Sequence, residues 1–298
     1  MNQNAISKVF CKLCGNDRVT SLYQSKLYGF RVGRCPGCGL TFVLDRIAEG
    51  KLKKMYDDEQ SFERFSDLMS NARVRERHRS VLCEIRQFLQ GSSSPVRIFD
   101  TGAGSGEFLN QAREFGFGVF GNELSNAAIC IARKQYGIEL SPMPLEQELR
   151  TDFFDVVTMW GLIEHVPDPL SIIKQAFRLL RSGGILYIYT PVWCLYDDIG
   201  LGLAQFCGWT RLLDRRITQA HLQLFSTEAM RKALAAIGFE LCRMEVVGEY
   251  NLPVTAYLES LGVPTRVRSS FAAAIDWLID HGLFFRNNMR VFCRKPVA

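Results

Sequence analysis

The feature that most constrains the fold is an alternation of short apolar runs with helical segments, which starts after "GSSSP" at residues 91–95. This alternation is typical of a parallel sheet whose strands are joined by crossover helices. In such sheets, functional residues gather at the carboxyl ends of the strands. The expected strands are 96–100, 117–122, 138–140, 154–159 and 184–190, with helices near 105–115, 125–136, 169–181 and 227–237, and a final antiparallel pair at 239–248 and 288–295.

A glycine-rich turn, "FDTGAGSGEFL", follows the first of these strands. Its three alternate glycines permit a tight strand-to-helix turn and the close approach of a ligand. The turn lacks the Gly-Lys-Ser/Thr of a Walker loop, and Glu107 stands where a dinucleotide fingerprint has its last glycine. Because an acidic residue at a helix start repels a pyrophosphate, a phosphate ligand is disfavoured.

A positively charged ligand suits this turn better, because Asp100 stands just before it. S-adenosylmethionine carries a sulfonium and an α-amino group, which a carboxylate and backbone carbonyls can face. Glu123, in "VFGNELS", ends the next strand, where a carboxylate can accept both hydroxyls of a ribose. Together the two motifs indicate S-adenosylmethionine.

With these residues the sequence resembles the class I S-adenosylmethionine-dependent methyltransferases over about residues 75–298. Further matching stretches are "FDVVTMWGLIEHVPDP", "LLRSGGILYIYTP", "HLQLFSTEAMRKALAAIGFE" and "NNMRVFCRKP". The resemblance implies an α/β, doubly wound, Rossmann-like fold with a seven-stranded sheet. The cofactor-binding residues that it implies are Asp100, Gly102, Ala103, Gly104, Gly106, Glu123, Leu124, Met143, Leu145, Trp160 and Gly161.

Two positions depart from the family pattern. Thr101 replaces the usual Ile or Val, and "SPMPLEQELRTD" lacks the Asp that usually approaches the adenine amino group. Trp160 has two interpretations, a cation–π contact with the sulfonium or a place in the core.

Four cysteines near the N-terminus form two Cys-x-x-Cys pairs, each followed by glycine, and predict structural Zn²⁺ bound by Cys11, Cys14, Cys35 and Cys38 in a zinc ribbon. The other six cysteines are scattered among apolar neighbours, which fits a reducing cytosol. Between the pairs, basic residues alternate with aromatic residues. These aromatic side chains either stack on RNA or, as we favour, pack as a small core.

The chain divides into a zinc ribbon (1–45), a helical linker (46–94) and a methyltransferase domain (95–298) with insertions at 191–220 and 251–286. The first insertion is expected to form a helical cap whose arginines bind an anionic group or form a solvated face. The second is amphipathic, and core packing is its default role over dimerisation, membrane contact or a substrate lid.

His221 is the first candidate for a catalytic base, followed by Tyr250, Glu249 and His165; the alternative role of His221 is that of a helix-entry residue that bonds the backbone. The zinc ribbon, the core and the stretch "HLQLFST" resemble sugar methyltransferases in which a histidine in this context lies at the active site. His165 follows Glu164 at a helix start, where a structural hydrogen bond is the favoured role over that of a base.

We therefore predict a cytoplasmic methyltransferase that acts on a small-molecule acceptor, such as a sugar, a glycan precursor or a secondary metabolite. An RNA methyltransferase that uses the ribbon to hold RNA is the alternative, although a net charge of +5 makes nucleic acid a weak expectation. An adapter that keeps cofactor binding for structure is a third possibility. Neither a signal peptide nor a membrane span is expected.

Overall fold

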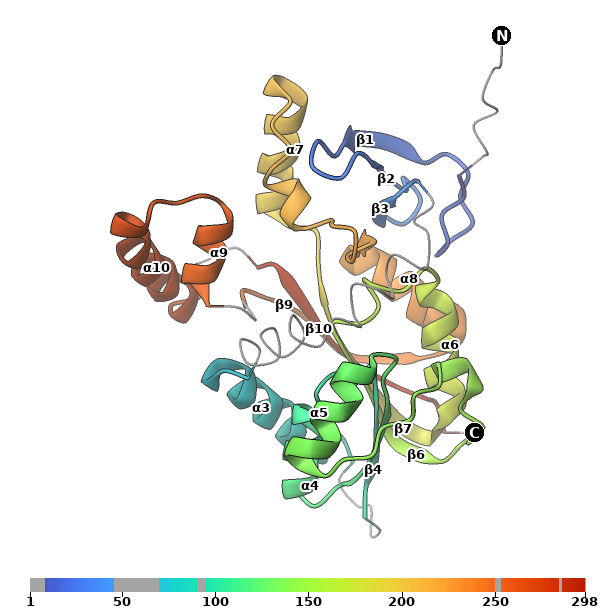
Figure 1. Cartoon of the computed structure of the whole chain (residues 1–298). Coiled ribbons are helices and arrows are strands. Elements are labelled where there is room, and N and C mark those ends of the chain that lie inside the picture. The colour runs from blue at the N-terminus through green and yellow to red at the C-terminus, as the bar shows by residue number, and fades with distance from the viewer. Residues whose placement is uncertain (1–8, 46–69, 90–94, 250–252, 284–285, 298) are drawn as a thin grey trace.

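A computed structural model of the chain describes residues 9–45, 70–89, 95–249, 253–283 and 286–297 (Figure 1). Two sheets organise these residues, a large one with six strands and a small one with four. In the described part of the chain, no helix combines the length and the apolar character needed to cross a membrane.

The large sheet has the strand order β5-β4-β6-β7-β10-β9. Its first four strands are parallel, and β10 runs antiparallel to both β7 and β9. The mixed α/β sheet that the alternation predicted is therefore confirmed. The strands are β4 (Arg97–Thr101), β5 (Gly118–Asn122), β6 (Phe154–Trp160), β7 (Leu180–Pro191), β9 (Glu240–Val247) and β10 (Asn288–Arg294).

The strand expected at 138–140 is reduced to one parallel bridge between Asn122 and Ser141. Two backbone hydrogen bonds make this bridge, from Glu123 N to Ser141 O and from Ser141 N to Gly121 O. Pro142 and Pro144 follow directly and carry no N–H for a longer ladder. The seventh strand of the expected sheet is thus cut to a single residue.

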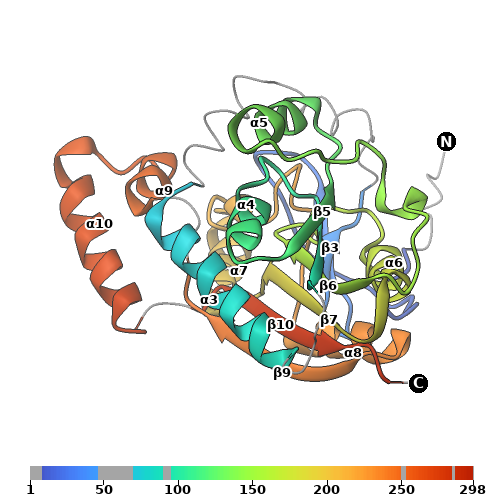
Figure 2. The ribbon, with the colours of Figure 1, turned by 90° about the horizontal axis from the view of Figure 1, so that it is seen from below.

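Helices cover both faces of the large sheet (Figure 2). Alternate strand residues divide between two hydrophobic clusters, so that Ile98 packs on one face and its neighbour Phe99 on the other. One face carries α3 (Ala72–Phe88), α4 (Glu107–Glu114) and α5 (Asn126–Tyr136). The other face carries α6 (Pro169–Leu179) and α8 (Thr227–Ile237).

The small sheet joins the N-terminal segment to the rest of the molecule. It contains β1 (Thr20–Gln24), β2 (Arg31–Arg34) and β3 (Thr41–Val43), and its fourth strand is β8 (Gln223–Leu224), which precedes α8. Cys11, Cys35 and Cys38 belong to the same hydrophobic cluster as residues of α6 and α8. The N-terminal segment is therefore docked on the large domain.

The two insertions expected from the sequence both contain helices. Residues 191–220 contain α7 (Leu195–Cys207) and the short η2 (Leu213–Arg215), which packs against the small sheet. Residues 251–286 contain α9 (Val254–Ser260) and α10 (Thr265–Asp280), which stand to one side of the sheet (Figure 1). A last 3₁₀ turn, η1 (Leu145–Gln147), follows the bridge at Ser141.

Candidate functional site

The glycine turn joins β4 to α4 in a left-handed backbone conformation. Gly102, Gly104 and Gly106 have φ angles of +66°, +54° and +78°, which side-chain-bearing residues rarely adopt. A Cβ at Gly104 would meet nothing within 4 Å, so the turn has open space at its tip. The amide of Ala103 donates to Asn122 O at 2.9 Å and ties the turn to the neighbouring strand. The turn thus has the conformation and the space to receive a ligand.

Glu123 lies at the end of β5, directly beside the turn. Its Oε2 accepts a hydrogen bond from Gly104 N at 3.0 Å, and its Oε1 accepts from Leu124 N and Ser125 N at 2.7 and 2.9 Å. These three amides hold the carboxylate in one orientation. The structure therefore brings together the two motifs that the sequence singled out.

Asp100 is buried at the end of β4, with 2% of its surface exposed. The Thr158 hydroxyl donates to its Oδ1 at 2.6 Å. Burial raises the pKa of Asp100 to about 8, partly opposed by this hydrogen bond. In the free protein Asp100 is therefore mainly neutral at pH 7, a state that the sequence did not predict.

Three further residues expected to bind the cofactor fall into two groups. Leu124 and Met143 have exposed side chains, and the Asn122 amide donates to Met143 O at 3.0 Å. Leu145 is 2% exposed and packs in the core with α6. The Leu145 side chain is therefore taken up by the core, and a cofactor contact at Leu145 stays a prediction.

Trp160 packs in an aromatic cluster at the end of β6. Its ring centroid lies 4.7 Å from that of His78 in α3, 5.1 Å from Phe108 in α4 and 4.8 Å from Tyr187. Its indole N–H is buried and finds no hydrogen-bond acceptor among the described residues. These contacts favour the core interpretation of Trp160. The next residue, Gly161, again has a positive φ of +57°.

Glu164, His165 and His221 gather just beyond this cluster. The two imidazole rings lie edge to face with centroids 4.6 Å apart, and His165 Nε2 is 3.9 Å from Glu164 Oε1. Glu164 is 2% exposed and its Oε2 accepts the Thr190 hydroxyl at 2.9 Å. Side chains far apart in the sequence thus form one polar cluster.

Burial changes the protonation of this cluster. It lowers the pKa of His165 to about 3 and that of His221 to about 4, because the charged imidazolium loses its water. Burial also raises the pKa of Glu164 to about 7. Both histidines are neutral at pH 7, and His221 takes up a proton less readily than the sequence implied.

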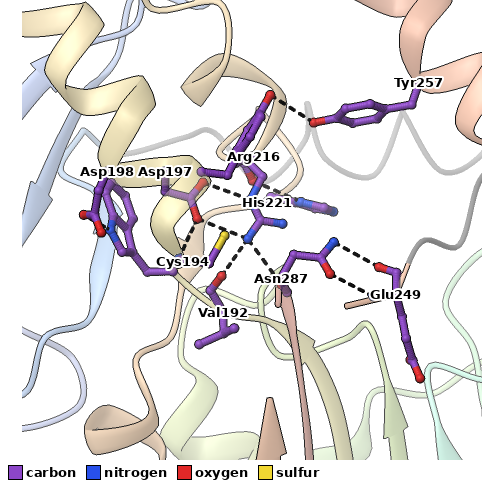
Figure 3. A network of polar contacts seen from close by, with 11 residues as sticks. Val192, Cys194, Asp197, Asp198, Arg216, His221, Glu249, Tyr257 and Asn287 are labelled. Carbon is purple, nitrogen blue, oxygen red and sulfur yellow. Dashed lines mark hydrogen bonds and ion pairs between the residues drawn. The ribbon is translucent and has the colours of Figure 1, made fainter. Parts of the chain in front are cut away.

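The other two candidate bases are less well placed or not described. Tyr250 lies outside the described residues. The Glu249 carboxylate is paired with Arg77, at 2.7 Å between Oε2 and Nε. Glu249 is also bound through its backbone to the Asn287 side chain, at 2.9 Å in both directions (Figure 3).

The segment that carries His221 is held by partners that the sequence did not reveal. Arg216 forms a buried ion pair with Asp197, at 3.0 Å between Nε and Oδ1, and donates to Val192 O at 2.6 Å (Figure 3). The backbone O of Arg216 in turn lies 3.2 Å from His221 Nδ1. Arg216 is therefore a structural residue, neither solvated nor free to bind an anion.

Gln223 fixes the same segment from its other side. Its amide donates to Ile163 O at 2.6 Å and to Val166 O at 3.0 Å, while Leu222 N donates to Glu164 O at 2.8 Å. Only the placement of a polar residue in an apolar stretch, "HLQLF", could have signalled this role.

The four N-terminal cysteines converge on one point. The Sγ atoms of Cys11 and Cys38 are 3.6 Å apart and those of Cys14 and Cys35 are 3.4 Å apart. All four lie within 4.8 Å of one another, and all are free thiols. Tetrahedral Zn²⁺ with bonds of about 2.3 Å would separate its sulfurs by about 3.8 Å, so the set fits zinc.

The ribbon's aromatic residues face the cap. Tyr23 and Phe30 are buried in one cluster with Leu213 and Ile217. The Arg34 guanidinium lies 4.1 Å from the centre of the Trp193 ring. These contacts confirm the packing interpretation for Tyr23 and Phe30, although the core they join includes the cap.

Comparison with known proteins identifies the family. A family model described as "Methyltransferase domain" matches residues 74–243, more than half of the chain. The chain therefore belongs to this methyltransferase family, and its large sheet and glycine turn are those of a class I S-adenosylmethionine-dependent methyltransferase domain. The match begins inside α3, whose residues the domain prediction assigned to the helical linker.

Curated relatives carry names of small-molecule methyltransferases. The chain is 32% identical over 121 residues to a ubiquinone biosynthesis O-methyltransferase of Nitrosomonas europaea, covering 37% of this chain and 52% of the relative. It is 28% identical over 172 residues to the protein of that name from Psychrobacter cryohalolentis, covering 53% and 64%. The chain thus spans about half to two thirds of the length of these relatives.

Solved structures share the fold. Phosphoethanolamine N-methyltransferase 2 of Haemonchus contortus superposes with a TM-score of 0.53 at 16% identity, over 86% of this chain and 62% of that chain. A methyltransferase-like protein of Bacillus halodurans superposes with a TM-score of 0.52 at 18% identity, over 73% of this chain and all of the other. At these identities the likeness concerns the fold alone.

Proposed function

We propose that the protein is an S-adenosylmethionine-dependent methyltransferase that methylates a small-molecule acceptor. The observation that carries this proposal is the hydrogen bond that joins the glycine turn to the Glu123 carboxylate at adjacent strand ends, 3.0 Å from Gly104 N. In a protein of this family, that arrangement offers a place for a nucleoside with a charged side chain.

Different residues of the chain would contact different parts of the cofactor. Glu123 keeps lone pairs for the ribose hydroxyls while its backbone donors hold it still. Leu124 and Met143 offer exposed apolar surface to the adenine. Asp100 and the open tip at Gly104 would face the methionine end, and the positive charge there would draw Asp100 towards its ionised state.

Methyl transfer is an in-line displacement in which the protein mainly positions the two partners. An acceptor lone pair forms the bond to the methyl carbon, and the electrons of the S–CH₃ bond return to sulfur, giving S-adenosylhomocysteine. The acceptor loses its proton to a nearby base or to solvent. We place this step beside Glu164, His165 and His221, and His221 as the base remains a prediction.

A sugar, a glycan precursor or a secondary metabolite is the acceptor class that we propose. The curated relatives named above support a small molecule rather than a polymer. RNA is disfavoured because Tyr23 and Phe30 of the ribbon are buried against the cap and offer no stacking surface. Zn²⁺ at the four cysteines is proposed as a structural ion, and ten free thiols support the cytosol as the compartment.

Calorimetric titration with S-adenosylmethionine tests the donor half of this proposal. We expect binding to the wild type and to Glu139→Ala, whose exposed carboxylate only pairs with Arg133, and a loss of at least about tenfold in affinity for Glu123→Ala. A wild type that does not bind, or an unchanged Glu123→Ala, would overturn the proposal.

A transfer assay with methyl-labelled cofactor tests the acceptor half. Hydroxylated small molecules and structured RNA are offered in parallel at two salt concentrations. Label in a small molecule supports the proposal, whereas transfer only to RNA with strong salt dependence would contradict it.

A further inference from the structure

We propose that Glu164, His165 and His221 form a binding site for one divalent transition-metal cation, distinct from the four-cysteine cluster. The inference rests on the proposed function in one respect, that this cluster lies where the acceptor binds. It concerns the same site but adds an ion that would hold the acceptor's oxygen.

The three side chains surround a common point. One ligand atom from each lies within 4.8 Å of the other two, so all three lie within about 2.8 Å of a shared centre. Metal–nitrogen and metal–carboxylate bonds are about 2.0–2.2 Å long. Side-chain adjustments of less than about 1 Å would therefore complete the coordination.

The histidines are oriented as ligating histidines are. His165 Nδ1 lies 3.1 Å from Ala220 O, and His221 Nδ1 lies 3.2 Å from Arg216 O. A carbonyl oxygen can only accept, so each Nδ1 carries a proton, and Nε2 is the ring nitrogen left to face a metal ion. Metal-binding histidines characteristically donate their other N–H to a carbonyl in this way.

The carboxylate is fixed in a similar manner. Thr190 is fully buried and donates to Glu164 Oε2, which leaves Oε1 on the side of His165. This carboxylate is 2% exposed, so burial has removed most of the water around it. A divalent cation at Oε1 would give it a direct charge partner.

The backbone around the cluster is held from several directions. Leu222 N donates to Glu164 O, and Val43 N of the ribbon donates to Leu222 O at 2.9 Å. The two ligand-bearing segments are thus joined to each other and to β3. A site held in this way loses little freedom when an ion binds.

The ligand set defines the class of ion and of acceptor. Two imidazole nitrogens and one carboxylate suit Mn²⁺, Fe²⁺, Co²⁺ or Zn²⁺ and leave coordination positions open. An acceptor with two adjacent oxygens, such as a vicinal diol or a hydroxyl beside a carbonyl, can fill those positions. The bound ion lowers the pKa of the coordinated hydroxyl and favours loss of its proton.

The cluster also lies next to the cofactor turn. A Cβ at Gly161 would lie 3.3 Å from Glu164 Oε1, and a Cβ at Gly102 would lie 2.9 Å from the Leu162 side chain. The segment 160–165 therefore runs from the glycine turn to the metal ligands. An acceptor oxygen on the ion would be close to the end of the cofactor that carries the methyl group.

Cobalt titration of protein loaded with a single equivalent of Zn²⁺ tests the site. The four thiolates take that one equivalent because soft sulfur ligands prefer zinc, so that Co²⁺ reports the second site. We expect about one Co²⁺ per chain, measured by elemental analysis, with visible d–d bands and no thiolate-to-cobalt charge-transfer band in the near ultraviolet. The expected loss of Co²⁺ affinity is at least about tenfold in His221→Ala and in the near-isosteric Glu164→Gln.

Two further variants sharpen the result. Thr190→Val keeps the shape but removes the donor to Glu164, and should weaken Co²⁺ by about tenfold. His281→Ala removes an exposed histidine of the same chain and should leave Co²⁺ binding unchanged. Thermal unfolding of each variant shows that the fold is kept.

The inference would be overturned if the wild type bound no second ion. It would also be overturned if Glu164→Gln and His221→Ala bound the second ion as tightly as the wild type does. The assay contains no cofactor, so its outcome is independent of the proposed function. Cofactor binding and methyl transfer without a second ion would leave the methyltransferase assignment intact and remove only the cation site.

Discussion

The donor half and the acceptor half of the site are built in different ways. The donor half comes from one continuous stretch, in which Gly104 and Glu123 are close in sequence and meet through a single hydrogen bond. The acceptor half draws on β3 in the ribbon, the segment 160–165, Thr190 and the segment 216–223. A local motif determines the first half, whereas the assembled tertiary fold determines the second.

This contrast predicts different sensitivities. Damage to the glycine turn should lower cofactor affinity, with only the local loss of stability that backbone strain brings and no effect on the acceptor cluster, because the turn is held by its own strand ends. Damage to the ribbon or the cap should affect the acceptor cluster, because those elements hold His221. Four experiments test this division, from the largest expected effect to the smallest.

Removal of the zinc site that we propose in the ribbon should have the largest effect. In Cys35→Ser/Cys38→Ser we expect a loss of more than about 5 kcal/mol from the stability of the ribbon, since zinc binding supplies much of the folding free energy of such small units. Methyl transfer should fall by at least about a hundredfold as β8 loses its partner β3. Metal content, near-ultraviolet circular dichroism and transfer rate measure these effects.

Substitution of a cysteine outside the cluster provides the control. Cys83→Ser changes an exposed thiol of α3 and should leave metal content and transfer unaltered. Full transfer by the metal-free double variant would show that the ribbon does not support the acceptor half.

Loss of the buried ion pair within the cap should come next. Arg216→Met leaves the fully buried Asp197 carboxylate without its cation and should cost about 3–5 kcal/mol of unfolding free energy. Arg31→Met breaks an exposed pair with Asp45 and should cost far less, because solvent screens an exposed pair. Urea unfolding measures both, and equal costs would contradict the account of the cap.

A matched pair of glycines tests the donor half. Gly104 and Gly137 both have positive φ, +54° and +61°, and a Cβ at either would meet nothing within 4 Å. Alanine at each should cost about 1–2 kcal/mol of stability through backbone strain. Only Gly104→Ala should also weaken S-adenosylmethionine, by at least about tenfold, as measured by calorimetry. Equal losses of affinity in both variants would place the cofactor elsewhere.

Asp100 should make stability depend on pH in a direction opposite to that of an ion-paired acid. Its pKa of about 8 in the folded state exceeds the ordinary value of 3.8, so the native protein holds a proton that the unfolded chain releases. Stability should fall as pH rises from about 4 to about 8 and level off above.

Urea unfolding at pH 6 and pH 8 measures this effect. Asp100→Asn keeps the acceptor for Thr158 and should lack this fall, so that between those pH values its stability changes by about 2 kcal/mol less than that of the wild type. Parallel pH profiles for both proteins would mean that Asp100 is ionised in the fold.

The sequence predicted the elements of the fold well because their signals are local. Apolar runs and turn glycines predict the strands that end near Asp100 and Glu123. The spacing of the four cysteines predicts their cluster. The prediction of a full strand at 138–140 was wrong because Pro142 and Pro144 lack the N–H groups that would extend the ladder beyond one bridge.

The acceptor cluster could be predicted only in part. His165 and His221 were candidates by their context, but their contact, their partnership with Glu164 and the support from Gln223 depend on pairing between β3 and β8. The fall in the pKa of His221 likewise comes from burial by residues distant in the chain. No pattern along the sequence records such an environment.

A crystal structure of the wild type with S-adenosylhomocysteine tests the central claim most directly. The account predicts that the ribose hydroxyls bind Glu123 and that the sulfur faces the cluster of Glu164, His165 and His221. A nucleoside bound away from the glycine turn, or a sulfur that faces away from that cluster, would contradict it.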